Sequence, residues 1–186
     1  MPFAFQRRRG TTAEHATFTG LLGELTVDTD KDVVVVHDGS TAGGFPLARA
    51  SGGTLADTTI RGIEEDINVV ASAATGTINF DVSTASIWYY TSNATANHTL
   101  NFRYSSSVSL NTALPVGDTI TLVWLNTNGA TAYYPSTIQI DGTTVTPKVP
   151  AAISSGNASS IDAYSFTIIK TASATYTVLE TQTKFA

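Results

Sequence analysis

Histidine is the most versatile catalytic and metal-binding residue type in this 186-residue sequence, and it occurs three times, as His15, His37 and His98. The three lie far apart in the chain and show none of the short spacings that zinc sites use. We interpret His37 as a strand-end residue before a turn. The alternative is that one histidine from each chain of a trimer binds an ion on the threefold axis. Cysteine is absent, which excludes disulfides, thiol nucleophiles and thiolate metal sites. The sequence predicts no metal and no cofactor.

The acidic residues show no catalytic pattern. Asp28, Asp30 and Asp32 resemble the start of a calcium-binding loop, but Val33 and Gly39 stand where that loop needs glycine and glutamate. We interpret the run as a hairpin turn. Glycoside hydrolysis needs two carboxylates across a cleft, and the C-terminal part holds few acidic side chains, some of them in turn motifs. No Gly-x-Ser-x-Gly nucleophile motif occurs. The sequence therefore predicts that the protein is not an enzyme, with a glycan-degrading spike as an alternative.

Aromatic side chains are the remaining candidates for contact with a ligand or a partner. Neighbouring residues of a strand point to opposite faces, so adjacent aromatic residues cannot all face one core. The candidates are Trp88, Tyr89, Tyr90, Tyr133 and Tyr134. Flat rings beside asparagine and threonine suit the C–H patches and hydroxyls of sugar rings. A subunit interface or an ordinary core is the alternative, and Trp124, within an apolar run, is expected in the core.

Charge is sparse and unevenly distributed along the chain. Charged residues make up 13% of the sequence and the net charge is −5. This argues against nucleic acid or an anionic membrane as the main partner, because both need a dense cationic face. Residues 1–66 hold 16 of the 25 charged residues. The rest of the chain must present threonine, serine and asparagine, as extracellular β proteins and subunit faces do. No apolar run is long enough to insert into a membrane.

The N-terminal part is predicted to form β-hairpins. Residues 24–27 and 33–36 are β-branched runs separated by a polar turn. Four consecutive valines show no alternation, so both faces of that strand need cover. About 48 residues cannot supply this cover alone. We therefore expect the faces of this strand to be covered by other copies of the chain, at Val33, Val34, Val35 and Val36.

A linker is expected over residues 51–76. Within it Ile60, Ile63, Ile67 and Val70 are spaced 3, 4 and 3 residues apart, which is the a/d pattern of a coiled coil. Isoleucine at both positions favours three or four helices. The run covers barely two heptads and contains a glycine, so an amphipathic turn or a short strand is the alternative. A short helix here would place the three isoleucines in a trimer interface.

The C-terminal part is a succession of strand candidates in which apolar and polar residues alternate. Turn signals such as Pro115-Val116-Gly117-Asp118 and Asp141-Gly142-Thr143 separate them. Short strands about ten residues apart predict a β-sandwich or jelly roll over residues 77–186. No helix is expected after Ala74. The candidate strands are 78–82, 100–104, 120–125, 138–140, 164–168 and 176–178.

Several separated motifs of the N-terminal part occur in a recognisable order. Residues 5–15, 23–28 and 36–47 carry the pattern RRGT…E…GE…D…HDG.T.GG.PL. This resembles the N-terminal module of bacteriophage tail-fibre and receptor-binding proteins, including the major tropism determinant class. The resemblance implies an intertwined trimer of β-hairpins, a β-prism, over residues 1–50. The valine-rich hairpin that needs cover from other chains agrees with it.

A second resemblance covers residues 76–186. The segments 88–97, 129–135 and 164–172 are similar to a C-terminal domain that recurs in structural proteins of marine phages, especially cyanophages. It implies no catalytic residues. Typical tail fibres are much longer than this chain, so a spike, a head fibre or a decoration is expected.

Together these observations predict an all-β homotrimer on the virion surface. It consists of an N-terminal β-prism, a linker and a C-terminal β-sandwich. The expected function is attachment, either to the host envelope, with a surface glycan as one candidate, or to other virion proteins through one end. Three weak sites on one base would raise the avidity of attachment. The alternative is a purely structural capsid decoration or tail-assembly protein without receptor contact.

Overall fold

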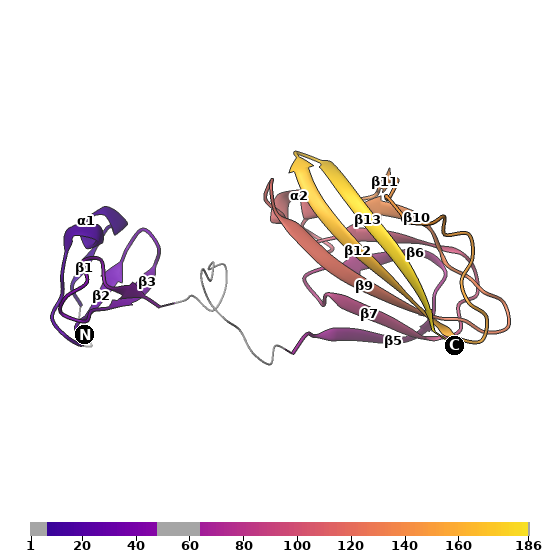
Figure 1. Ribbon diagram of the computed structural model, residues 1–186, viewed down its shortest axis with the longest axis horizontal. Helices are drawn as coiled ribbons and strands as arrows, with labels where there is room; N and C mark the ends of the chain where they lie inside the picture. The colour runs from indigo at the N-terminus through magenta and orange to yellow at the C-terminus, as the bar shows by residue number, and fades with distance from the viewer. Residues whose placement is uncertain (1–6, 48–63, 186) are drawn as a thin grey trace. The chain divides into compact units, whose positions relative to one another are not determined.

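A computed structural model describes residues 7–47 and 64–185. The chain divides into two units, Met1–Gly62 and Ile63–Ala186, and β-strands are the main regular secondary structure in the described part of each (Figure 1). The predicted all-β class is therefore confirmed. Within the described ranges, no helix combines the length and the apolar character needed to cross a membrane.

The first unit contains a four-stranded sheet in the order β1-β2-β3-β4. The predicted hairpin is present, because β2 and β3 pair antiparallel with Leu25 opposite Val36. β1 adds to it in parallel and β4 antiparallel. The bounds are β1 (Arg9–Gly10), β2 (Leu25–Asp28), β3 (Val33–Val36) and β4 (Phe45–Pro46).

A short helix that the sequence analysis did not predict, α1 (Thr12–Thr17), precedes the hairpin. The Thr11 hydroxyl accepts the backbone N–H of Glu14, and the Glu14 carboxylate accepts the backbone N–H of Thr11. This reciprocal pair is a capping box, whose Thr-x-x-Glu signal is readable in the sequence. Six residues are too few for a stable isolated helix. Packing on the sheet, chiefly by the buried His15, therefore holds α1 in place.

The valine-rich strand β3 is covered on one face by its own unit. Val33 and Val35 are buried, at 9% and 2% exposed, whereas Val34 is 37% exposed. The buried pair lies opposite Asp28 and Thr26 of β2, and side chains of α1 hydrogen-bond to both of those residues. The prediction that all four valines need cover from other chains is thus corrected for Val33 and Val35. Strand alternation directs those two side chains toward the helix.

The second unit is a sandwich of two sheets, in the orders β11-β10-β8-β6 and β13-β12-β9-β7-β5 (Figure 1). All six predicted strands of this part are confirmed. The bounds are β5 (Ile67–Ala73), β6 (Gly76–Asp81), β7 (Ile87–Ser92), β8 (His98–Arg103), β9 (Thr119–Thr127), β10 (Pro135–Ile140), β11 (Thr143–Val145), β12 (Ile161–Ala172) and β13 (Thr175–Phe185).

The connections of the sandwich differ from those of a jelly roll. From β5 to β10 the chain alternates between the two sheets, so β5, β7 and β9 are parallel neighbours in one. In the same way β6, β8 and β10 are parallel neighbours in the other. A jelly roll is built of antiparallel Greek keys, so this part of the prediction is corrected. Among residues 64–185, antiparallel hairpins are formed by β10 with β11 and by β12 with β13, where the connecting turns are tight.

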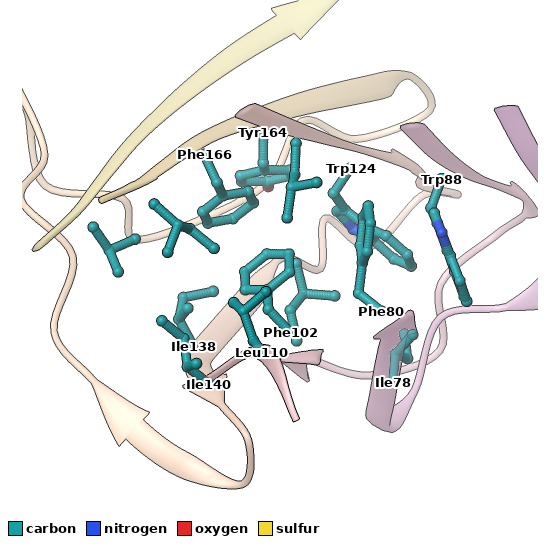
Figure 2. Close-up of a cluster of buried hydrophobic side chains, with 14 of the residues drawn as sticks. Ile78, Phe80, Trp88, Phe102, Leu110, Trp124, Ile138, Ile140, Tyr164 and Phe166 are labelled. Carbon is teal, nitrogen blue, oxygen red and sulfur yellow. The ribbon is translucent and has the colours of Figure 1, made fainter. Parts of the chain in front are cut away.

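The core of the sandwich lies between the two sheets (Figure 2). Phe102 of one sheet meets Phe166 of the other with ring centroids 4.8 Å apart, and Phe80 meets Trp88 at 5.0 Å. These separations are those of favourable aromatic pairs. Trp124 is completely buried, as predicted.

The second unit begins earlier than predicted. β5 pairs in parallel with β7, with Ile67 opposite Ile87, so residues 67–76 belong to the sandwich and not to a linker. Ile67 and Val70 thus lie on a strand, as the strand alternative for this segment has it. Ile60 and Ile63 lie outside the described residues.

One helical turn, α2 (Leu110–Ala113), corrects the expectation of no helix after Ala74. Ser109 caps its start, and the Asp141 carboxylate accepts the backbone N–H groups of Leu110 and Asn111 at 2.7 and 2.9 Å. The turn motif at Asp141 therefore also anchors a segment distant in the sequence.

Candidate interaction sites

An apolar sheet face of the first unit lacks cover from the described residues. Strand register and alternation place six side chains on this open face, opposite the face that α1 covers. Phe45 is 54% exposed, Leu47 is 53% exposed, and Leu21 and Leu22 in a nearby loop are still more exposed. Contiguous apolar patches of this kind mark interaction surfaces. The open face consists of Leu25, Val27, Val34, Val36, Phe45 and Leu47.

The covered face holds a directed chain of hydrogen bonds. The Gly20 N–H donates to His37 Nδ1 at 3.3 Å, which assigns the proton of this ring to Nε2. His37 Nε2 donates to the Thr26 hydroxyl at 2.9 Å, and that hydroxyl donates to His15 Nε2 at 2.8 Å. His15 Nδ1 in turn donates to the Thr11 carbonyl at 3.0 Å. Both nitrogens of each imidazole have a hydrogen-bond partner, so the two rings fix the helix to the sheet.

Two glycines of the first unit are required by the position of His37. A Cβ atom on Gly20 would lie 2.5 Å from His37 Cγ. A Cβ atom on Gly44 would lie 2.7 Å from both His37 Nδ1 and Val35 Cγ1, and Gly44 also has a φ of +60°. The imidazole is thus clamped between glycine backbones. Within the described residues, no cluster of three or more histidine, aspartate or glutamate side chains is arranged to hold a metal ion.

The polar loop after His37 is organised by Asp38. Its carboxylate accepts the backbone N–H groups of Thr41 and Ser40 at 2.7 and 2.9 Å, and both hydroxyls as well. These bonds, led by the Thr41 N–H, hold the pKa of the Asp38 carboxyl well below its ordinary value. The loop is therefore organised by hydrogen bonds within the sequence motif itself.

The aromatic candidates of the second unit do not form one platform. Trp88 is buried against Phe80, and Tyr90 packs on Trp124 with centroids 4.7 Å apart. Tyr89 is half-buried and points to the opposite face of β7. Most of this run therefore belongs to the core, which is the alternative raised from the sequence.

Tyr133 is held by a buried polar network at the end of the sandwich. The side-chain amides of Asn126 and Asn128 both donate to its carbonyl, at 3.1 and 3.0 Å. Asn128 also donates to Asp162, which is completely buried, and burial raises the pKa of this carboxyl. The network fixes the loop that carries Tyr133 and Tyr134.

Tyr134 lies in the wall of a pocket of about 330 Å³. The pocket is bounded by β10, β11, the segment after β11 and one residue of β13, Glu180. The Glu180 side chain is 5% exposed, and burial raises the pKa of its carboxyl to about 7. We call this hollow the Glu180 pocket. Sequence reasoning missed Glu180, although it follows Tyr176 and Val178 at the alternating positions of β13 that face inward.

The N-terminal part of the chain is similar to known proteins. Residues 6–41 match the family described as "Major tropism determinant N-terminal domain". The tail fiber receptor-binding protein of Bordetella phage BPP-1 is 52% identical to this chain over 87 residues, which are 47% of this chain and 22% of that protein. The chain thus spans about a fifth of the length of that relative.

Solved structures of this tropism-determinant class also match. The I1 and M1 variants of the major tropism determinant are 76% identical to this chain over 24% of its length and 12% of theirs, with a TM-score of 0.24.

Proposed function

We propose that this chain is an attachment protein of a phage virion and that it acts as a homotrimer. The observation that carries the proposal is the open face, because it lies on a unit matching a tropism-determinant N-terminal domain. The relative is a phage tail-fibre receptor-binding protein. The chain is accordingly located on the virion tail.

The open face supplies the contact between copies. Five of its six apolar side chains come from three adjacent strands and Leu47 directly follows β4, so they form one continuous surface. Phe45 and Leu47 of this face are each more than half exposed. Association of copies that removes this apolar area from water is favourable. The trimeric β-prism implied by the tropism-determinant resemblance requires three of these faces to pack together around an axis.

The sandwich supplies the contact with the target. Residues 67–186 hold only nine charged side chains, so their surface is made mainly of hydroxyl, amide and small apolar groups. Such a surface suits a neutral polar target such as a host envelope glycan, or another virion protein. Three copies on one base raise avidity although each single contact is weak.

The proposal is tested by competition for adsorption. Host cells incubated with the purified full chain are expected to bind it and then to adsorb fewer phage particles. Val34→Asp, placed on the open face, is expected to lose this competition because it separates the copies. Failure of the native chain to bind host cells, together with stable binding to purified virions lacking it, would favour the purely structural decoration instead.

A further inference from the structure

Glu180 is an anomaly in the interior of the sandwich. It lies opposite Phe166 on β12, and the neighbouring inward pair toward the β12–β13 turn is the apolar Ile168 and Val178. An apolar side chain of similar size would stabilise the fold more, because a buried carboxyl must give up its hydration. Its Oε1 atom is buried and has no hydrogen-bond partner within the described part of the chain.

The neighbouring polar groups are directed elsewhere. Gln182, the next inward residue of β13, donates to the Ser155 carbonyl and to the Tyr164 hydroxyl, both at 2.9 Å. Lys148 bonds to β13 through its backbone and lies opposite Leu179, which faces outward. The titratable groups on the carboxyl's own side include Tyr164 on β12, Tyr176 on β13 and Tyr134 in the pocket wall. No cation of the described chain neutralises Glu180.

The walls of the Glu180 pocket combine two kinds of surface. Tyr134, Pro147 and Ile153 offer a ring and aliphatic carbon. Residues with short hydroxyl side chains also contribute to the lining of the pocket: Ser136, Thr137, Thr144 and Thr146. The volume of about 330 Å³ lies at the lower end of the range for small-molecule sites.

We propose that the Glu180 pocket binds a primary ammonium group carried on a sugar ring, with the Glu180 carboxylate as the partner of the ammonium. A buried carboxylate without a donor accepts strong charge-assisted hydrogen bonds from an ammonium and repels anions. Tyr134 provides an aromatic surface for the cation or for ring C–H groups. The hydroxyls match the hydroxyls of an amino sugar, whereas the bare methylene chain of a lysine would leave them unused.

The use of this pocket in host attachment rests on the proposed function, but its ligand chemistry does not. Binding is therefore measured on the purified full chain, without cells. The probes for calorimetric titration at about pH 7, where the amine of an amino sugar is mainly the ammonium, are glucosamine, N-acetylglucosamine, glucose and Nα-acetyl-lysine amide. Glucosamine is expected to bind at least about tenfold more tightly than the other three, since only it offers both ammonium and ring hydroxyls.

Two variants locate the site. Glu180→Gln keeps the size of the side chain and is expected to weaken glucosamine binding at least about tenfold. Thr146→Phe, at an exposed residue of the rim, is expected to block the pocket and gives the same test if the first variant fails to fold. Glu65→Gln, at an exposed glutamate outside the pocket, is the matched control and should leave binding unchanged.

Three results would overturn the assignment. Equal binding of glucose and glucosamine would show that no ammonium is recognised. Preference for the lysine probe would assign the pocket to a protein side chain. Absence of glucosamine binding, or unchanged binding in both pocket variants, would remove the site altogether. Adsorption competition by the native chain would remain in each of these cases, so the proposed function is judged separately.

Discussion

At the scale of single residues, His37 explains why the first unit contains glycine at two separated positions. Gly20 and Gly44 lie against opposite parts of the same imidazole, and any Cβ atom there would overlap it. The histidine is buried, at 1% exposed, and has hydrogen bonds at both ring nitrogens. Its role is therefore packing and hydrogen bonding within the unit.

Gly20→Ala is expected to destabilise the first unit by about 1–3 kcal/mol, because the new methyl group overpacks against His37. The measurement is the free energy of unfolding in denaturant. His37→Ala alone is also destabilising, but it removes the atoms with which the methyl group would clash. The double variant should therefore be less destabilised than the sum of the two single changes. Simple additivity would show that the clash is absent.

The pH dependence of stability tests the burial of Glu180. Its pKa is raised from 4.5 to about 7 by burial, so the folded state binds this proton more tightly than the unfolded state. Glu180 therefore lowers the free energy of unfolding as the pH rises from about 4.5 to about 7. His98 acts in the opposite direction. Burial lowers the pKa of its imidazole from 6.5 to about 4, so its contribution to stability is lost as the pH falls from about 6.5 to about 4. These two contributions should thus oppose each other between about pH 4.5 and 6.5.

Glu180→Gln should separate these two effects. We expect it to raise the free energy of unfolding by roughly 2–3 kcal/mol at about pH 8 and to change it little at about pH 4. Urea unfolding at both pH values measures the difference. An equal change at both values would mean that the carboxyl is not desolvated in the folded state.

At the scale of elements, strand β3 separates two environments by strand alternation alone. Val35 faces α1 and is buried, whereas Val34 faces the open side. Adjacent residues of one strand therefore have different expected roles, one in folding and the other in association.

Val34→Asp is expected to dissociate the assembly and to leave the far-ultraviolet circular dichroism of the chain unchanged. Val35→Asp is the matched contrast, because it buries an unpaired charge. It should lower the free energy of unfolding of the first unit by several kcal/mol and so unfold it. Sedimentation velocity and circular dichroism distinguish the two results. Unfolding by both variants, or dissociation by neither, would contradict the assignment of the open face.

The sequence allowed the strands to be predicted far better than their connections. β-Branched runs around a polar turn located β2 and β3, and alternation with turn residues located the six C-terminal strands, because these are local properties of the sequence. The path between the sheets was not predictable, because parallel neighbours such as β6 and β8 are set by contacts distant in the sequence. The proposed role of Glu180 was likewise not predictable, because it depends on the pocket that residues of β10 and β11 form beside this carboxyl.

At the scale of the whole molecule, the two units divide the proposed work. The first unit carries the tropism-determinant match and the open face, and the second carries a separate core and the Glu180 pocket. Assembly through the first unit would present three copies of the second. Attachment strength would then depend on the number of copies as well as on the affinity of each.

The most direct test of this account is the mass of the full chain in solution. Sedimentation equilibrium at micromolar concentration is expected to give three times the 19.5 kDa mass of one chain, because the open face must be covered by its copies. A single species of 19.5 kDa under the same conditions would contradict the account.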